Sequence, residues 1–131
     1  MKYEFAEEIQ KKAEEISRIL FPHIKIERVK CFMSYGTSSR RTIARCHAIG
    51  KVVQMALGIK AFYVLEFLSE RFDKLSDEDK VKTIIHELMH IPKSFGGGFK
   101  HHNYVTDKNV NKHYKMYQEL KGDGKKGGWF K

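Results

Sequence analysis

Residues 76–92 read SDEDKVKTIIHELMHIP, and this stretch predicts the best-defined element of the chain. Ser76 suits a helix cap because its hydroxyl can accept a hydrogen bond from a backbone N–H of the first turn. The three acids that follow suit the positive end of the helix dipole. Apolar residues then recur at helical spacing: Val81, Ile84, Ile85 and Leu88. Since Pro92 cannot comfortably continue a helix, we expect an amphipathic helix from about residue 77 to residue 91.

The same helix carries a candidate metal-binding motif, His86-Glu87-Leu88-Met89-His90. Residues four apart project from one face of a helix, so His86 and His90 can both bind one Zn²⁺ ion. Glu87 follows the first histidine and lies close to the metal without needing to bind it. There it can take a proton from a zinc-bound water and later pass it to a leaving amine. The motif therefore predicts a zinc site with Glu87 as the catalytic residue.

A zinc site of this type needs a third protein ligand. Residues 93–103, KSFGGGFKHHN, form a glycine-rich segment that lets the chain turn back over the helix, and His102 near its end is the favoured third ligand. His101 is its nearest competitor, because adjacent residues of an extended segment point in opposite directions and only one usually coordinates. His113 and Glu119 also stay open, and Glu119 would give a site of two histidines and one glutamate.

The segments before the motif helix predict a second helix and a small sheet. Residues 4–20 have apolar side chains every three or four positions, which indicates an amphipathic helix. Residues 24–33 alternate like a strand, with a phase change that suggests a bulge, and residues 42–49 should form a hairpin with them. Residues 61–68, AFYVLEFL, predict the clearest strand, since they are rich in aromatic and β-branched residues. Residues 50–58 are ambiguous between a short helix and irregular structure.

Val110, Tyr114, Tyr117 and Leu120 indicate a last amphipathic helix that ends near Gly122. The predicted fold class is thus α+β, with an N-terminal helix, a small three-stranded sheet, the motif helix and a C-terminal helix. The chain's 131 residues fit one domain, which we place at residues 1–121, with a flexible basic tail at 122–131.

The composition of the chain indicates the cellular compartment in which the protein acts. No apolar run approaches the roughly 20 residues that cross a bilayer. Acids stand where a signal peptide would have its apolar core, so we expect a cytoplasmic protein that does not enter membranes. Cys31 and Cys46 fit that compartment as reduced, small buried side chains.

The formal net charge of +9 is unevenly spread along the chain. Residues 21–60 contain eight lysines and arginines against a single acid, Glu27. A basic field of this size attracts polyanions, so nucleic acid, or a substrate bound to nucleic acid, is a candidate partner. A solvated, lysine-rich surface is the alternative explanation.

Residues 61–103 resemble the phage-type metallopeptidase family, whose members occur in phages, bacteria and archaea. The resemblance rests on the strand Tyr63-Val64-Leu65-Glu66, on the helix start Lys74-Leu75-Ser76, and on residues 86–92, HELMHIP, which are similar to the family's HELLHIP motif. Ala44-Arg45 stands on the preceding strand, as in the family. His102-Asn103 aligns with a His-Asp pair, so an uncharged amide replaces the carboxylate that would orient a ligand histidine.

The family is similar in layout to the SprT-like proteases, and the resemblance implies a minimal zincin-like domain. It implies His86, His90 and His102 as zinc ligands and Glu87 as the catalytic base. We therefore expect a zinc-dependent metallopeptidase that hydrolyses peptide bonds of a protein or peptide substrate. The substrate would add to the free edge of the 61–68 strand. The alternative is a zinc-containing nucleic-acid-binding or scaffold module without peptidase activity.

Overall fold

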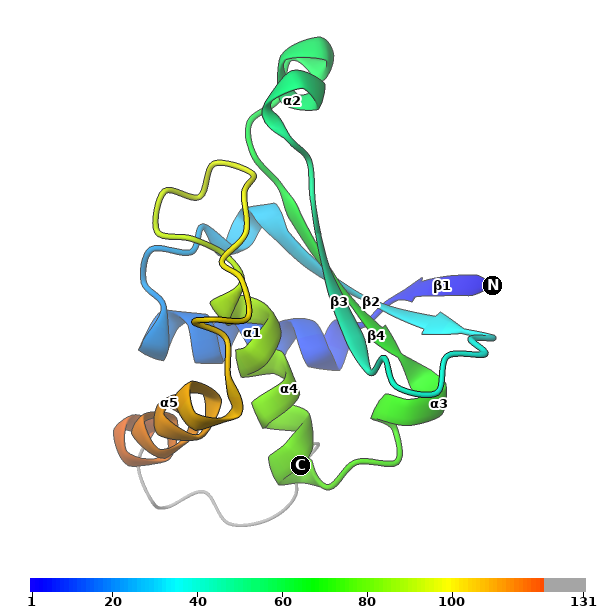
Figure 1. Cartoon of the computed structure of the whole chain (residues 1–131), viewed down its shortest axis with the longest axis vertical. Coiled ribbons are helices and arrows are strands. Elements are labelled where there is room, and N and C mark those ends of the chain that lie inside the picture. Colours follow the sequence, from blue (N-terminus) through cyan, green and yellow to red (C-terminus); the bar gives the residue numbers. More distant parts are fainter. Residues whose placement is uncertain (122–131) are drawn as a thin grey trace.

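The computed structural model describes residues 1–121 and shows an α+β fold (Figure 1). The predicted flexible tail, residues 122–131, lies outside the described residues. The elements, in chain order, are β1 (Lys2–Phe5), α1 (Glu7–Leu20), η1 (Ile26–Arg28), β2 (Val29–Tyr35), β3 (Ala44–Ala48), α2 (Lys51–Leu57), β4 (Tyr63–Leu68), α3 (Ser69–Phe72), α4 (Asp77–Met89) and α5 (Asp107–Lys121). No described helix is long and apolar enough to span a bilayer.

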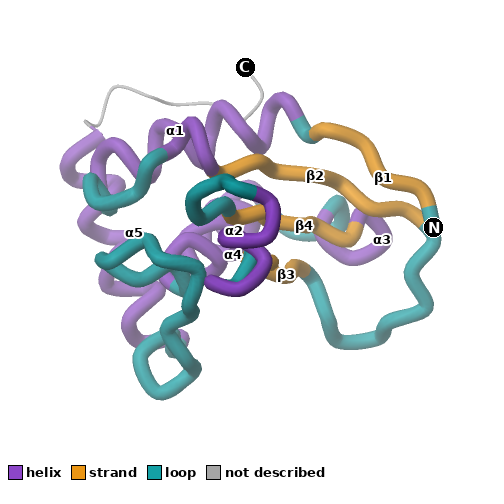
Figure 2. The backbone as a smooth tube through the Cα atoms, turned by 90° about the horizontal axis from the view of Figure 1, so that it is seen from above, coloured by secondary structure: helices purple, strands orange, loops and turns teal. Residues whose placement is uncertain are grey.

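The strands form one mixed sheet in the order β1-β2-β4-β3, and Figure 2 shows them side by side. β4 pairs in parallel with β2 and antiparallel with β3, while β1 pairs antiparallel with β2. β4 is therefore a central strand, which explains its almost wholly buried, apolar sequence. The edges of the sheet are β1 and β3.

One face of the sheet, here called the inner face, packs against the helices and forms the core. Cys31, Leu65 and Cys46 occupy equivalent positions on β2, β4 and β3, and all three belong to or border the core cluster. The helices α1 and α4 contribute their apolar stripes, including Ile16 and Ile84, to the same cluster. Figure 1 shows α1, α4 and α5 on one side of the sheet, whereas α2 projects away at the far end of β3 and β4.

The prediction of three strands was wrong, because Lys2–Phe5 form a fourth strand. The N-terminal helix consequently begins at Glu7 rather than at residue 4. Phe5 fits the helical spacing of the apolar residues that follow, so the local sequence pattern predicts a helix where the structure has a strand. What holds it extended is long-range pairing: Phe5 lies opposite Phe32, and the Ala6 N–H donates to the Cys31 carbonyl at 2.9 Å.

The predicted hairpin between the first two internal strands was also wrong. β4 lies between β2 and β3, and residues 36–43 cross its end, where the Leu68 N–H donates to the Ile43 carbonyl at 2.9 Å. The phase change in residues 24–33 is not a bulge. Residues Ile26–Arg28 form a 3₁₀ turn that precedes β2, so the alternation belongs to two separate elements.

The side chain of Gln10 joins α1 to β2 inside the protein. It is 4% exposed, its Nε2 donates to the Val29 carbonyl at 2.9 Å, and its Oε1 accepts from the Cys31 N–H at 2.8 Å. Both backbone groups would be buried without partners if this amide were removed. The contact therefore fixes α1 under the sheet and, through it, the packing of α4.

We expect Gln10→Ala to lower the free energy of unfolding by about 2–4 kcal/mol, because two buried polar groups lose their hydrogen bonds. Urea denaturation measures this change. Gln118→Ala, on the exposed surface of α5, is the matched control and should shift stability by less than about 0.5 kcal/mol. Equal stability of the two variants would show that the Gln10 contacts contribute nothing.

Candidate metal centre

The helix α4 presents the motif residues, and its start matches the sequence prediction. The Ser76 hydroxyl accepts from the Asp79 N–H at 3.1 Å, and three acids occupy the first turn. The helix ends at Met89, and His90 still has right-handed helical dihedrals as its cap residue. His86 and His90 therefore stay one turn apart, with ring centroids separated by 5.1 Å.

The loop after Pro92 folds back over the end of α4, as predicted. The Lys100 N–H donates to the His90 carbonyl at 2.8 Å, and His90 Nδ1 lies 2.6 Å from the Lys100 carbonyl oxygen. Nδ1 must carry the hydrogen of that bond, because the carbonyl can only accept. The lone pair of His90 is thus left on Nε2, which is the orientation that a ligand histidine needs.

Two side chains from other elements fix the path of this loop. The Tyr63 hydroxyl donates to the Gly98 carbonyl at 2.8 Å and accepts from the Gly97 N–H at 3.0 Å. Gln54 of α2 donates to the Gly96 carbonyl at 3.0 Å. The sequence reasoning missed both anchors, and no motif signals them, since each acts on backbone groups of distant residues.

The fold brings His102 to the two motif histidines. The ring centroid of His102 lies 5.7 Å from that of His86 and 4.9 Å from that of His90. One ligand nitrogen from each residue lies within 4.8 Å of the other two. Three imidazole nitrogens so placed could hold one divalent metal ion.

The electrostatic surroundings keep the motif imidazoles neutral. Burial lowers the pKa of His86 to about 4, and the neighbouring His90 and His102 add to the effect. Burial also lowers the pKa of His90, against the opposing influence of its hydrogen bond to Lys100. A neutral imidazole is the form that binds metal, so at neutral pH both nitrogens are available without loss of a proton. These residues thus fit a divalent metal ion.

Glu87 lies beside this cluster and is 5% exposed. Burial raises the pKa of its carboxyl to about 7. A divalent cation held by the neighbouring histidines would favour the charged carboxylate and oppose this shift. A carboxyl that titrates near neutral pH is suited to accept and return a proton.

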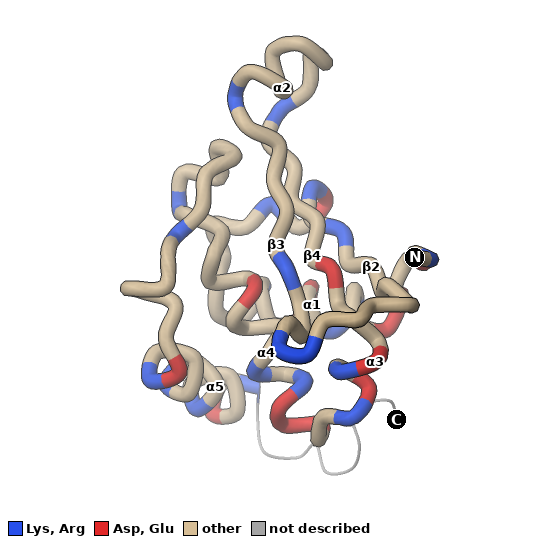
Figure 3. Tube along the Cα trace, turned by 45° about the vertical axis from the view of Figure 1, so that its right-hand side comes forward, with Lys and Arg blue, Asp and Glu red and all other residues tan. Residues whose placement is uncertain are grey.

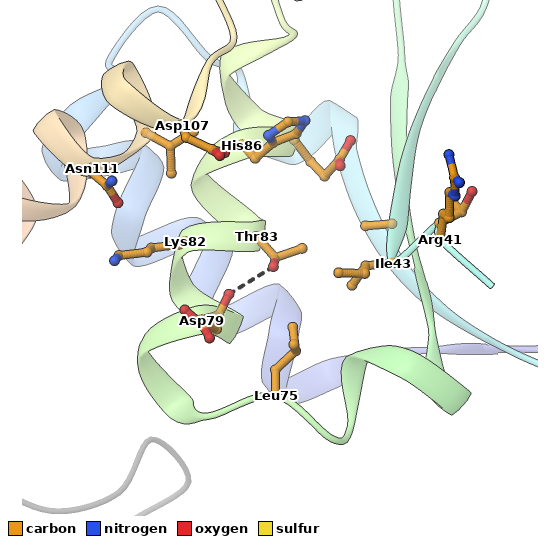
Figure 4. A pocket seen from close by; sticks show the side chains of 13 residues that line it. Arg41, Ile43, Leu75, Asp79, Lys82, Thr83, His86, Asp107 and Asn111 are labelled. Atoms are coloured by element: carbon orange, nitrogen blue, oxygen red, sulfur yellow. Dashed lines mark hydrogen bonds between the residues drawn. The ribbon is translucent and has the colours of Figure 1, made fainter. Parts of the chain in front are cut away.

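Two cavities meet at Glu87 and together form an open cleft. The larger, of about 640 Å³, lies between α4, α5 and residues 41–44, and Figure 4 shows side chains from these three segments around it. The smaller, of about 320 Å³, is bounded by β3, α4 and residues 99–102. Ala44, His86 and Glu87 line both. All three histidines of the candidate metal centre line the smaller cavity, and His86 and Glu87 connect it to the larger one.

The strand beside this cleft differs from the predicted one. We expected the 61–68 strand to offer a free edge, but β4 is paired on both sides. The edge strand beside the motif helix is β3, whose outer edge pairs with no other described strand. The order of the strands could not be predicted from their order in the sequence, because the pairing of β3 depends on where residues 36–43 cross the sheet.

The other candidate ligands lie elsewhere. His101 lines the smaller cavity, but its nitrogens are not in the three-histidine group. His113 Nδ1 lies 2.9 Å from the Asn109 carbonyl oxygen, and the ring of His113 packs against that of Phe21, with centroids 5.2 Å apart. Glu119 is exposed on α5 and is also outside the group. Among the candidates for the third ligand, the fold therefore brings His102 alone to the motif histidines.

Gly97 holds the loop in a conformation that other residues would strain. Its φ is +105°, and an added Cβ would lie 2.6 Å from the Ile49 carbonyl oxygen. We expect Gly97→Ala to cost about 1–3 kcal/mol of stability and to weaken metal binding, because the loop that carries His102 must shift. Thermal unfolding and metal titration measure the two effects. Gly98→Ala is the matched control, since an added Cβ there meets nothing within 4 Å; equal effects of both variants would contradict the assigned role of Gly97.

One family model matches the chain. It is described as "Putative phage metallopeptidase" and covers residues 1–123, which include the sheet, the motif helix and the loop that carries His102. No curated protein and no solved structure matches the chain significantly. On the extent of the family match, the chain belongs to the putative phage metallopeptidase family.

Proposed function

We propose that this protein is a zinc-dependent peptidase that hydrolyses peptide bonds, with His86, His90 and His102 as metal ligands and Glu87 as general base. The observation that carries the proposal is the convergence of three ligand nitrogens within 4.8 Å of one another beside a buried glutamate. Family membership supports the metal and the reaction class. The choice of zinc follows from the donor set, because three imidazoles suit Zn²⁺ better than Mg²⁺ or Ca²⁺.

Each residue has a distinct role in the proposed reaction. The three histidines would hold the metal, and the Lys100 carbonyl keeps the His90 ring turned so that Nε2 points away from that carbonyl. When bound, the metal lowers the pKa of a water molecule and polarises the carbonyl of the scissile bond. Glu87 takes the proton from the attacking water and returns it to the nitrogen of the leaving amine.

The cleft supports an extended peptide as the substrate form. β3 lies beside it with an edge that pairs with no strand among residues 1–121, and an extended segment can add to such an edge through backbone hydrogen bonds. Binding through backbone hydrogen bonds selects a substrate for its extended conformation more than for particular side chains. Residues of α5, including Asp107 and Asn111, line the larger cavity and would contact a substrate side chain. Unfolded or loop segments of proteins are therefore the proposed substrates.

Metal removal tests the proposal directly. We expect the zinc-loaded protein to cleave a denatured, fluorophore-labelled protein, a chelator to reduce cleavage to background, and added zinc to restore it. The same chelator presaturated with zinc is the control and should leave cleavage unchanged. Full cleavage by metal-free protein would contradict the proposal.

A further inference from the structure

The face of the sheet opposite the helices, here called the outer face, is partly open. Strand alternation and register place Tyr3 and Phe5 of β1 on it, with Lys30 and Phe32 of β2. Val64 and Glu66 of β4, and Arg45 and His47 of β3, also lie on it, whereas Ser34 and Leu68, on the same face, are buried. None of the proposed catalytic residues lies here, although Arg45 on the edge strand β3 also lines the smaller cavity of the cleft.

Aromatic side chains gather at the β1–β2 half of the outer face. Tyr3 is 59% exposed and Phe5 is 48% exposed, although both are large and one is wholly apolar. The Phe5 ring meets the Phe32 ring edge-on, with centroids 5.9 Å apart. Phe32 itself is only partly buried. Exposed aromatic rings on neighbouring strands form a surface on which flat, π-rich ligands can stack.

The remainder of the outer face carries two cations, Lys30 and Arg45, and one acid, Glu66. Lys30 and Arg45 reach it from β2 and β3, and Figure 3 shows the basic position on β3 beside the acidic one on β4. That acid, Glu66, accepts from His47 Nε2 at 2.8 Å and from Arg45 Nη1 at 3.5 Å, so its charge is compensated within the sheet. From Arg28 to Leu65, the stretch that contributes β2 and β3, the chain contains no acid.

We propose that the outer face binds single-stranded nucleic acid. Stacking on aromatic rings requires bases that are not already stacked in a duplex, and cations beside the rings meet the phosphates. A protein partner would not require this combination of exposed rings and the positive charge of Lys30. The net charge of +9 acts in the same direction at longer range.

Fluorescence anisotropy of the full-length protein with labelled oligonucleotides of 15 nucleotides, about the site size of one single-strand-binding domain, tests this proposal. We expect a single strand to bind at least about tenfold more tightly than a duplex of equal length at equal salt. Tyr3→Ala/Phe5→Ala should weaken single-strand binding about tenfold or more, because the bases lose their stacking partners. Metal-free protein should bind equally well, which separates this site from the metal centre.

Three further variants make the test specific. Lys30→Gln should reduce the slope of log K against log salt by about 0.7, the value for one phosphate contact of a single strand, whereas Lys108→Gln on exposed α5 should not. Val52→Ala/Met55→Ala removes comparably exposed apolar side chains from α2 and should leave binding intact. If the Tyr3→Ala/Phe5→Ala protein does not fold, the salt dependence of binding by Lys30→Gln decides the test. Absence of binding at low salt, equal binding of duplex, or equal loss in the α2 variant would overturn the proposal.

Discussion

Replacing Glu87 by glutamine is expected to lower kcat for peptide hydrolysis by about 10²–10⁴-fold, the range that general acid–base catalysis contributes. Glutamine has nearly the same shape as glutamate, so it can occupy the same buried position. It cannot accept a proton from water, and it cannot return one to the leaving amine. The measurement is turnover of a denatured, labelled protein by zinc-loaded wild type and variant at saturating substrate.

The control for this variant is its metal content. The ligand nitrogens belong to the three histidines, so Glu87→Gln should bind zinc as wild type does. Because burial raises the pKa of Glu87 to about 7, an uncharged amide at this position should not destabilise the metal-free fold. Undiminished turnover would refute the role of Glu87. Absence of turnover in zinc-loaded wild type would favour the alternative, a zinc-containing binding or scaffold module.

Replacing His102 by alanine is expected to weaken zinc binding by at least about 100-fold, because one of three protein ligands is lost. His102 is exposed and lies in the loop, so its removal should leave the core and the α4 helix unchanged. Competition with a chromophoric zinc chelator measures the affinity. Peptidase activity at limiting zinc should fall in parallel.

His101→Ala provides the matched control. His101 is the adjacent residue, is also exposed and lines the same smaller cavity, but its nitrogens are outside the ligand group. Its replacement should leave zinc affinity within about threefold of wild type, since surface changes rarely exceed about 0.5 kcal/mol. A reversal, in which His101→Ala loses zinc and His102→Ala retains it, would show that the loop turns the other histidine toward the metal.

The α4 helix could be predicted from sequence because every signal for it is local. The Ser76 cap, the acids of the first turn, the apolar stripe and Pro92 all lie within one stretch, and the observed helix, Asp77–Met89, differs by two residues at its end. The pairing of His86 with His90 follows from helical geometry alone. The strand at 61–68 was likewise evident, since its composition reflects burial on both faces.

The elements that the sequence did not predict depend on long-range contacts. β1 exists because Lys2–Phe5 pair with β2, and nothing within those residues distinguishes them from the helix that follows. The central position of β4 depends on where residues 36–43 cross the sheet, although their turn-rich sequence is typical of a hairpin. The position of His102 depends on a loop that Tyr63, Gln54 and Gly97 hold, through contacts that no short motif encodes.

The central claim, that three histidines form one metal centre, is tested most directly by the metal content of full-length protein purified without a metal-affinity tag. Wild type and His101→Ala should contain close to one zinc per chain, and His102→Ala should contain little or none. Wild-type protein that folds, contains no metal and does not take up added zinc would contradict the account, because the histidine cluster would then have no metal to hold.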